Sequence, residues 1–216
     1  MAGFPWRLVT VDIDGTLTRV HGWKPIATAF GREIEFGDEM ARFYAREIGE
    51  DEHLARLVNL ARGHTIAEVL EVVAGTPKIR GISEAVGELH TLGARTAILS
   101  HNPGYVIDYY RRTFGFDDGD GFSVPVDPTG LLAPVRAARA DKVAGLAELL
   151  RRTGVRPREV AHVGDGWADA RVFRQVGGGI SLNSPLAEVD RAADRAVRTD
   201  DLREVVRVLR ALEPRG

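Results

Sequence analysis

Two aspartates stand two residues apart at the end of a short apolar run. The run 9–13 is rich in β-branched residues, which predicts a buried strand, and Gly15 ends it. Because side chains alternate along a strand, Asp12 and Asp14 leave its tip on the same side. Two carboxylates this close at an apolar strand end are costly unless a cation or a proton neutralises them. The pair therefore indicates a site for a hard metal ion, with chemistry beside it.

A second acidic pair follows another apolar run, the strand predicted over 160–163. Asp165 comes directly after it within Gly-Asp-Gly, and Asp169 follows one helical turn later. With Asp12 and Asp14, these residues supply only oxygen ligands, which favours Mg²⁺ over zinc or copper. Each motif alone could be an ordinary turn, but two of them at equivalent strand ends favour a shared metal site.

Two further polar features accompany the predicted elements. Ser100, His101 and Asn102 follow the apolar strand predicted over 94–99, and a hydroxyl beside free backbone N–H groups at the start of the next helix suits an anion. A plain helix cap is the alternative. Lys142 begins a predicted helix, where a cation opposes the helix dipole, so carboxylates or a phosphate would compensate it. A solvated surface lysine is the alternative there.

Strands and helices alternate along most of the chain, which predicts an α/β fold with a parallel, Rossmann-like sheet flanked by helices. The aspartates and Ser100 fall at the carboxyl ends of predicted strands, where such folds bind ligands. The stretch 19–80 carries helical patterns only, in three apolar stripes. We therefore expect a core of residues 1–18 and 81–216, with a small helical cap of residues 19–80 inserted after the first strand.

The rest of the chain has strong periodicity and clear breaks. A region rich in glycine and proline over 116–137 predicts short strands and turns, arranged as a hairpin. Strands are expected over 94–99, 160–163, 179–182 and 196–197. Helices are expected over 82–92, 105–113, 141–153, 168–176 and 202–212.

The composition is that of an ordinary globular protein, with 44% hydrophobic and 28% charged residues among 216. A net charge of −2 gives no electrostatic basis for binding nucleic acid or an anionic membrane, and the apolar runs are too short to span a bilayer. The absence of cysteine excludes disulfides, a thiol nucleophile and zinc–thiolate sites. Because the first strand is expected to begin near Arg7, no room is left for a signal peptide, and we expect a cytoplasmic protein. The oligomeric state stays open.

Four motifs in order resemble those of the haloacid dehalogenase-like (HAD) superfamily of hydrolases. Within that superfamily the chain is most similar to the phosphoserine phosphatase-like group, over nearly its whole length and including the helical insert. The resemblance implies a Mg²⁺-dependent phosphatase acting on a small phosphorylated metabolite, with phosphoserine as one candidate. The motifs are Asp12-Ile13-Asp14-Gly15-Thr16-Leu17-Thr18, Ser100, Lys142 and Gly164-Asp165-Gly166-Trp167-Ala168-Asp169.

The resemblance also implies a role for each acidic residue. Asp12 would be the nucleophile and form an aspartyl-phosphate, which splits one hard displacement into two. Asp14 would protonate the leaving alkoxide and then deprotonate the water, while its backbone carbonyl helps to bind Mg²⁺. Asp165 would ligate the metal, and Asp169 would support it through water or by holding Lys142.

The same resemblance places Ser100 and Lys142 on the phosphoryl oxygens. His101 and Asn102, which stand where the phosphoserine phosphatases usually have two glycines, would join them in binding the substrate. Trp167 is followed by alanine where that group tends to have asparagine. These departures lie where substrate and cap meet, so they concern the choice of substrate rather than the chemistry.

The cap is expected to select the substrate. An arginine fork suits a carboxylate, although charged helix faces are usually only solvated. The charged candidates are Arg32, Glu33, Glu35, Arg42, Arg46 and Arg56. Tryptophans expected to serve packing are Trp6, Trp23 and Trp167, the last of which could also line the pocket. Histidines without metal-ligand spacing, interpreted as surface or cap residues, are His21, His53, His64 and His90.

Three alternatives to a hydrolase stay open at this point. A phosphotransferase would use the same site but pass the phosphoryl group to another alcohol. A phospho-receiver domain also gathers aspartates and a lysine at parallel strand ends, but such domains are much shorter and lack a helical cap. An inactive binding domain would not need the complete acidic set.

Overall fold

The chain forms an α/β fold around one parallel sheet. The computed structural model describes residues 3–136 and 141–215, so the first two residues and the last residue of the expected core, and residue 137 of the expected hairpin region, lie outside it. Within the described ranges six strands pair in parallel, in the order β3-β2-β1-β4-β5-β6. This confirms the predicted fold class. The strands are β1 (Leu8–Val11), β2 (Arg95–Pro103), β3 (Asp118–Phe122), β4 (Val160–Gly164), β5 (Gly178–Leu182) and β6 (Arg195–Val197).

Helices cover both faces of the sheet, and the alternation within β1 explains how. Val9 and Val11 pack toward one face and Leu8 toward the other, so every residue of this strand is buried. The first face is covered by α5 (Ile82–Thr91), α6 (Gly104–Phe114) and α10 (Leu202–Ala211). The second face is covered by α7 (Lys142–Thr153) and α8 (Trp167–Phe173). Two shorter helices complete this part, η1 (Pro157–Glu159) and α9 (Ala187–Ala192), neither of which was predicted.

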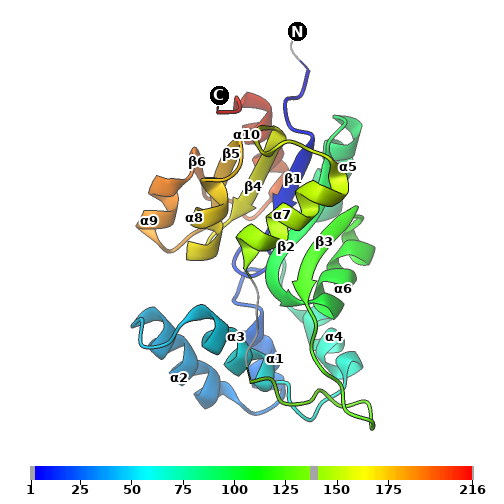
Figure 1. The fold of residues 1–216 in the computed structure, drawn as a ribbon, viewed down its shortest axis with the longest axis vertical. Helices are drawn as coiled ribbons and strands as arrows, with labels where there is room; N and C mark the ends of the chain where they lie inside the picture. The colour runs from blue at the N-terminus through cyan, green and yellow to red at the C-terminus, as the bar shows by residue number, and fades with distance from the viewer. Residues whose placement is uncertain (1–2, 137–140, 216) are drawn as a thin grey trace.

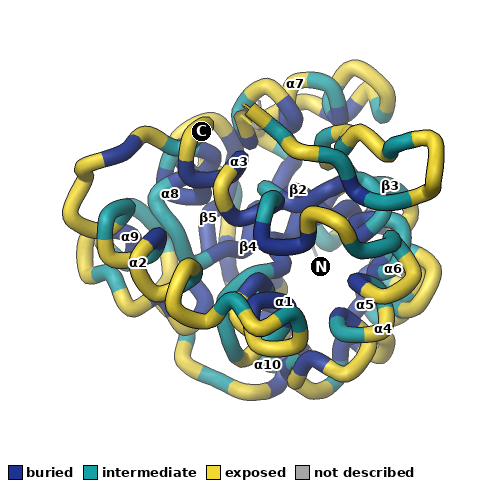
Figure 2. Tube along the Cα trace, turned by 90° about the horizontal axis from the view of Figure 1, so that it is seen from below, coloured by how far each residue is buried: buried dark blue, intermediate teal, exposed yellow. Residues whose placement is uncertain are grey.

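The residues after the first strand are helical, as expected. They form α1 (Trp23–Ala29), α2 (Glu33–Tyr44), α3 (Glu50–Asn59) and α4 (Ile66–Gly75), one helix more than the three predicted stripes. The carboxyl ends of the strands point toward α1, α2 and α3 (Figure 1). The largest cluster of buried apolar side chains continues from the sheet into α1, α3 and α4. Viewed from the side of these helices, the buried strands lie behind the more exposed helical turns (Figure 2). The assignment of 19–80 as a separate cap domain stays a prediction.

The glycine-rich region 116–137 forms a strand followed by a segment of turns. Its first part is β3, which pairs in parallel with β2 at the edge of the sheet. The expected hairpin lies further along, where the amides of Asp127 and Ala133 donate to the carbonyls of Leu131 and Pro125. This part contains one isolated antiparallel bridge, between Val126 and Leu132. It packs against α3, because the Asn59 side chain donates to the carbonyl of Val135 at 2.7 Å and accepts from its amide at 2.8 Å. Residues of the predicted core thus contact the predicted cap directly.

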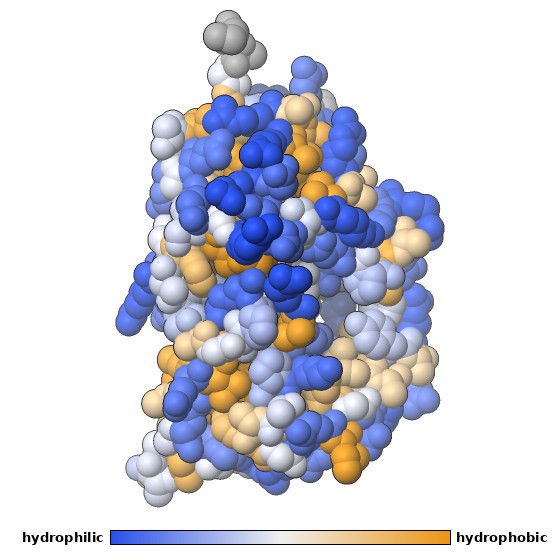
Figure 3. Space-filling view, turned by 180° about the vertical axis from the view of Figure 1, so that it is seen from behind, coloured by the Kyte–Doolittle hydropathy of each residue, from blue (hydrophilic) through white to orange (hydrophobic). Residues whose placement is uncertain are grey.

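Strand β2 is longer than predicted and continues through Ser100, His101 and Asn102. These residues are therefore inside a strand, and the helix expected after Pro103 begins at Gly104 with no side chain capping it. The anion site expected at its start stays a prediction. The other elements begin and end within about three residues of the predicted limits. In the described part of the chain, no helix is long and apolar enough to cross a membrane. From behind, the surface is hydrophilic over most of its area and is hollowed between the sheet and the helices below it (Figure 3).

Candidate active site

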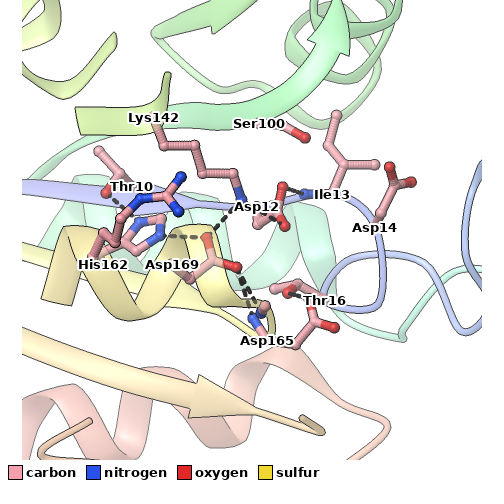
Figure 4. Close-up of polar contacts among 12 residues, drawn as sticks. Thr10, Asp12, Ile13, Asp14, Thr16, Ser100, Lys142, His162, Asp165 and Asp169 are labelled. Carbon is pink, nitrogen blue, oxygen red and sulfur yellow. Dashed lines mark hydrogen bonds and ion pairs between the residues drawn. The ribbon is translucent and has the colours of Figure 1, made fainter. Parts of the chain in front are cut away.

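Lys142 joins two aspartates from different strand ends. Asp12 follows β1, and Asp169 lies in the first turn of α8. The Lys142 ammonium is 2.8 Å from Asp12 Oδ2 and 2.6 Å from Asp169 Oδ1, and the lysine is only 4% exposed (Figure 4). The two carboxylates compensate a cation that would otherwise oppose the dipole at the start of α7. The alternative of a solvated surface lysine is wrong.

The Asp169 carboxylate is fixed by donors on both of its oxygens. Oδ2 accepts from the backbone amides of Asp165 at 3.1 Å and Gly166 at 2.8 Å. Oδ1 accepts from Lys142 and lies 2.8 Å from Nε2 of His162, whose Nδ1 is 2.8 Å from the hydroxyl of Thr10 (Figure 4). A proton on Nε2 satisfies both contacts of the imidazole. The sequence marks His162 only as a polar residue inside an apolar strand, and it does not indicate which side chains His162 contacts.

Three carboxylates converge at the strand ends and suit a hard cation. Asp12, Asp165 and Asp169 each place a side-chain oxygen within 4.8 Å of the others. Asp165 is also held by the Thr16 hydroxyl at 3.0 Å. A compact set of oxygen donors is the chemistry that Mg²⁺ takes in proteins. The Asp14 carboxylate lies outside this group, consistent with our expectation that only its backbone oxygen approaches a metal.

The ionisation of these groups reflects their burial and mutual repulsion. Burial, reinforced by Asp169 and Asp14, raises the pKa of Asp12 to about 7 despite the nearby lysine. Burial and the charges of Asp12 and Asp169 raise the pKa of Asp165 well above its usual value. For Asp169 burial acts in the same direction, but Lys142 and His162 outweigh it and lower the pKa. One lysine thus faces three carboxylates, and a divalent cation would balance the charge.

Asp14 lies on the other side of Ile13 from the lysine (Figure 4). Its Oδ1 accepts from the amide of Gly22 at 3.0 Å, and its Oδ2 accepts from the Asn102 amide at 3.0 Å. Asn102 also donates to the Ser100 hydroxyl at 3.0 Å. The structure therefore gathers Asp14, Ser100 and Asn102 in one network, and Asn102 contacts the two other side chains. Its role as a phosphoryl ligand stays a prediction.

A cavity opens from the aspartates toward α2 and α3. The predicted residues Asp12, Asp14, Ser100, His101, Lys142, Asp165 and Asp169 all line it. Its opposite wall is mainly apolar and aromatic, and of its residues only Trp167 was expected to be able to line the pocket. That wall contains His21, Trp23, Met40, Phe43, Tyr44, His53, Leu54, Leu57 and Trp167, so two histidines interpreted as surface or cap residues and two tryptophans expected to serve packing face the site.

None of the six charged cap candidates lines this cavity among the described residues. Arg32, Glu35 and Arg56 line a separate hollow on the outer side of α2 and α3, so their assignment as substrate readers is wrong for this cavity. The charged residue that the helices do contribute is Glu50 at the start of α3. Arg171 of α8 binds both of its oxygens, at 2.8 and 2.6 Å. Sequence spacing gave no indication of this pair.

Comparison with known proteins agrees with this geometry. The family model for haloacid dehalogenase-like hydrolases matches residues 6–177. A phosphoserine phosphatase of Archaeoglobus fulgidus is 28% identical over 212 residues, covering 94% of this chain and 60% of that protein. One of Streptomyces coelicolor is 27% identical and is covered over 50% of its length. The chain thus spans about half to three fifths of the length of these curated relatives.

Solved structures share the fold. A phosphoserine phosphatase carrying a phospho-aspartyl intermediate analogue superimposes with a TM-score of 0.81 at 21% identity, over 94% of this chain and 98% of that one. A probable phosphoserine phosphatase from Vibrio cholerae gives a TM-score of 0.78 at 23% identity, covering 94% of this chain and 64% of that one. At these identities the likeness concerns the fold. The family match, which covers most of the chain, establishes that this protein belongs to the haloacid dehalogenase-like hydrolases.

Proposed function

We propose that the protein is a Mg²⁺-dependent phosphatase that hydrolyses small phosphomonoesters through an aspartyl-phosphate on Asp12. The observation that carries this proposal is the placement of Asp12 at the floor of the cavity, beside Lys142 and two further carboxylates. The names of the curated relatives support a phosphatase and make phosphoserine the first substrate to assay.

In the first half-reaction, a carboxylate oxygen of Asp12 forms a bond to phosphorus while the bond from phosphorus to the ester oxygen breaks. Asp14, which lines the same cavity, gives a proton to the departing alkoxide. In the second, Asp14 takes a proton from water, the water oxygen bonds to phosphorus, and Asp12 leaves with inorganic phosphate as the other product.

The surrounding residues position and neutralise charge during both steps. Lys142 and Ser100 would bind phosphoryl oxygens, and Asp169 holds the lysine in place. Asp12 and Asp165 would hold Mg²⁺, with Asp169 close to them and the backbone oxygen of Asp14 assisting. When bound, the metal would neutralise charge on the phosphoryl oxygens. Because both Asp169 oxygens already accept hydrogen bonds, we assign this residue mainly to holding Lys142.

The test is the substitution Asp12→Asn with Mg²⁺ present. Phosphate release from phosphoserine and other small phosphomonoesters should fall by about 10³-fold or more, since the amide is no nucleophile. Mass spectrometry after acid quenching should detect a phosphorylated Asp12 in the parent protein and none in the variant. Asp38→Asn, at an exposed position on α2, is the matched control and should keep full activity. Equal turnover by the parent and Asp12→Asn would refute the mechanism.

A further inference from the structure

The apolar wall of the cavity is built from rings that hold one another in place. The Phe43 ring stacks on His53 with centroids 3.9 Å apart and planes 4° from parallel. Trp167 meets Phe43 edge-on at 5.6 Å and Tyr44 at 5.8 Å. The indole N–H of Trp167 donates to Glu188, so its polar atom is already used. The wall therefore offers pre-organised aromatic surface to whatever is attached to the phosphoryl group.

Two charged groups beside this wall, Glu50 and Lys142, are already engaged in ion pairs. Both oxygens of Glu50 are bound by Arg171, and although burial opposes it, these bonds keep the pKa of Glu50 below its usual value. Lys142 is engaged by Asp12 and Asp169. Among the described residues that line the cavity, there is no arginine. A substrate carboxylate lodged against this wall would therefore lose its hydration without gaining a cationic partner from the described residues of the cavity.

The wall also contains two histidines, His21 and His53, and Arg46 lies beside it. The Nδ1 of His21 accepts from the Trp23 amide at 3.4 Å. Burial lowers the pKa of His53 to about 4, so its ring is neutral at pH 7. Arg46 lies with its guanidinium 5.2 Å from the centre of the Trp167 ring and 3.6 Å from Glu188, and its side chain is 72% exposed. It therefore covers the outer side of Trp167 rather than the cavity.

The polar group left for the substrate is neutral. His101 lines the cavity next to Ser100, and its buried Nε2 has no hydrogen-bond partner among the described residues. Burial and the charge of Lys142 lower the pKa of His101 to about 4. A neutral imidazole can hydrogen-bond to an uncharged polar atom of a ligand. The cavity, of which the proposed phosphoryl site is part, has a volume of about 130 Å³, so the alcohol portion can be no larger than the single benzene ring that ~150 Å³ accommodates in another protein.

We propose that the alcohol portion of the preferred substrate is flat, apolar and uncharged, about the size of one ring, rather than a phosphorylated amino acid. This inference rests on the proposed phosphatase function and specifies its substrate class. Phosphorylated aryl-alkyl alcohols are the chemical class that fits the wall formed by Phe43, Tyr44, His53 and Trp167.

Three phosphomonoesters of primary alcohols test the proposal: 2-phenylethyl phosphate, ethyl phosphate and phosphoserine. With Mg²⁺ and the parent protein, kcat/KM for the phenylethyl ester should exceed that for the ethyl ester by about 10- to 100-fold, the ratio expected for burying one ring. It should exceed that for phosphoserine by at least as much. A kcat/KM for phosphoserine equal to or above that of the phenylethyl ester overturns the inference and leaves the phosphatase function standing. If none of the three esters is hydrolysed, the result contradicts both the proposed function and the inference.

Substitutions in the wall test whether its side chains cause the preference for the phenylethyl ester. Phe43→Ala should lower the ratio of kcat/KM for phenylethyl to ethyl phosphate by about 10-fold. Phe43→Leu keeps apolar bulk if the alanine variant fails to fold, and it should still lower the ratio because the stacking surface is lost. Phe30→Ala is the matched control, since Phe30 stacks on His64 at 3.6 Å and does not line the cavity. An unchanged ratio in both folded Phe43 variants, or an equal drop in the control, contradicts the assignment of this wall.

Discussion

At the scale of single residues, the site depends on one carboxylate whose orientation is fully specified. Asp169 accepts from Lys142, His162 and two backbone amides, so neither of its oxygens can turn without losing a partner. The lysine that Asp169 holds is also the group that contacts Asp12. The position of the proposed nucleophile is therefore set indirectly by a histidine on β4.

This arrangement predicts that His162→Ala is costly to stability. The substitution leaves the buried Asp169 and Thr10 oxygens each short of one partner, and we expect the free energy of unfolding to fall by about 1–3 kcal/mol. Urea denaturation monitored by circular dichroism measures it. His90→Ala is the control, because His90 bonds Asp117 at a partly exposed position and should cost less than about 1 kcal/mol. An equal loss in both variants would contradict this account of His162.

At the scale of elements, α3 and α8 are joined across the cavity. The two hydrogen bonds from Arg171 to Glu50 tie the first turn of α3 to the helix that carries Asp169. The Trp167 contacts with Phe43 and Tyr44 tie α8 to α2 as well. Side chains of α8 in the predicted core and of α2 and α3 in the predicted cap thereby hold the apolar wall in a fixed position relative to the acidic group.

A double-mutant cycle on Glu50→Gln and Arg171→Gln measures this connection. Because the side chains are 30% and 38% exposed but bidentate, we expect a coupling free energy of about 1 kcal/mol, the upper end for surface pairs. Unfolding free energies of the parent, the single variants and the double variant give this value. The pair Arg46–Glu188 is a suitable comparison, since its atoms are 3.6 Å apart and Arg46 is largely exposed, and its coupling should be close to zero. If the coupling free energy of Glu50–Arg171 is as small as that of Arg46–Glu188, the pair does not hold α3 and α8 together.

At the scale of the whole molecule, stability should depend on pH and metal together. Burial keeps the pKa of Asp12 near 7 in the folded metal-free protein, and that of Asp165 is raised as well. Between pH 4 and 7, His53 and His101, whose pKa values burial lowers to about 4, bind fewer protons in the folded chain than in the unfolded chain. Over the same range the two carboxyl groups instead bind more protons in the folded chain, so their contribution to stability declines as pH rises. A bound cation would take the place of these protons.

We therefore expect Mg²⁺ to stabilise the protein more at pH 7.5 than at pH 5. The gain in unfolding free energy on replacing EDTA with MgCl₂ should be larger at the higher pH, by an amount on the order of a few kcal/mol. Calorimetry with EDTA and with MgCl₂ at the two pH values provides the measurement. Asp12→Asn removes one of the titrating groups and should reduce the difference between the two conditions. A Tm shift from Mg²⁺ that is the same at both pH values would contradict this charge balance.

Much of the fold and the acidic part of the site follow from the sequence because their signals are local. Alternation over two residues and the helical repeat mark the strands and helices, and they place Asp12 and Asp165 at strand ends. Parallel strands end at one edge of the sheet, so aspartates far apart in the chain had to come together. The limits of β2 were missed because its last residue, Pro103, pairs with Phe122 of another strand.

The sequence by itself determined the fold class, the carboxylate set and the lysine, since these depend on residue type and short-range spacing. Only the tertiary structure decided which side of each cap helix faces the site. Glu50 and Arg171 are 121 positions apart in the chain, so short-range spacing cannot reveal their contact. The rotation of α2 and α3 about their own axes depends on which side chains these helices bury. Apolar and aromatic side chains gain most by turning inward, so the charged cap residues face outward. The acidic group was therefore predictable from the sequence, whereas the apolar wall opposite it is a consequence of packing.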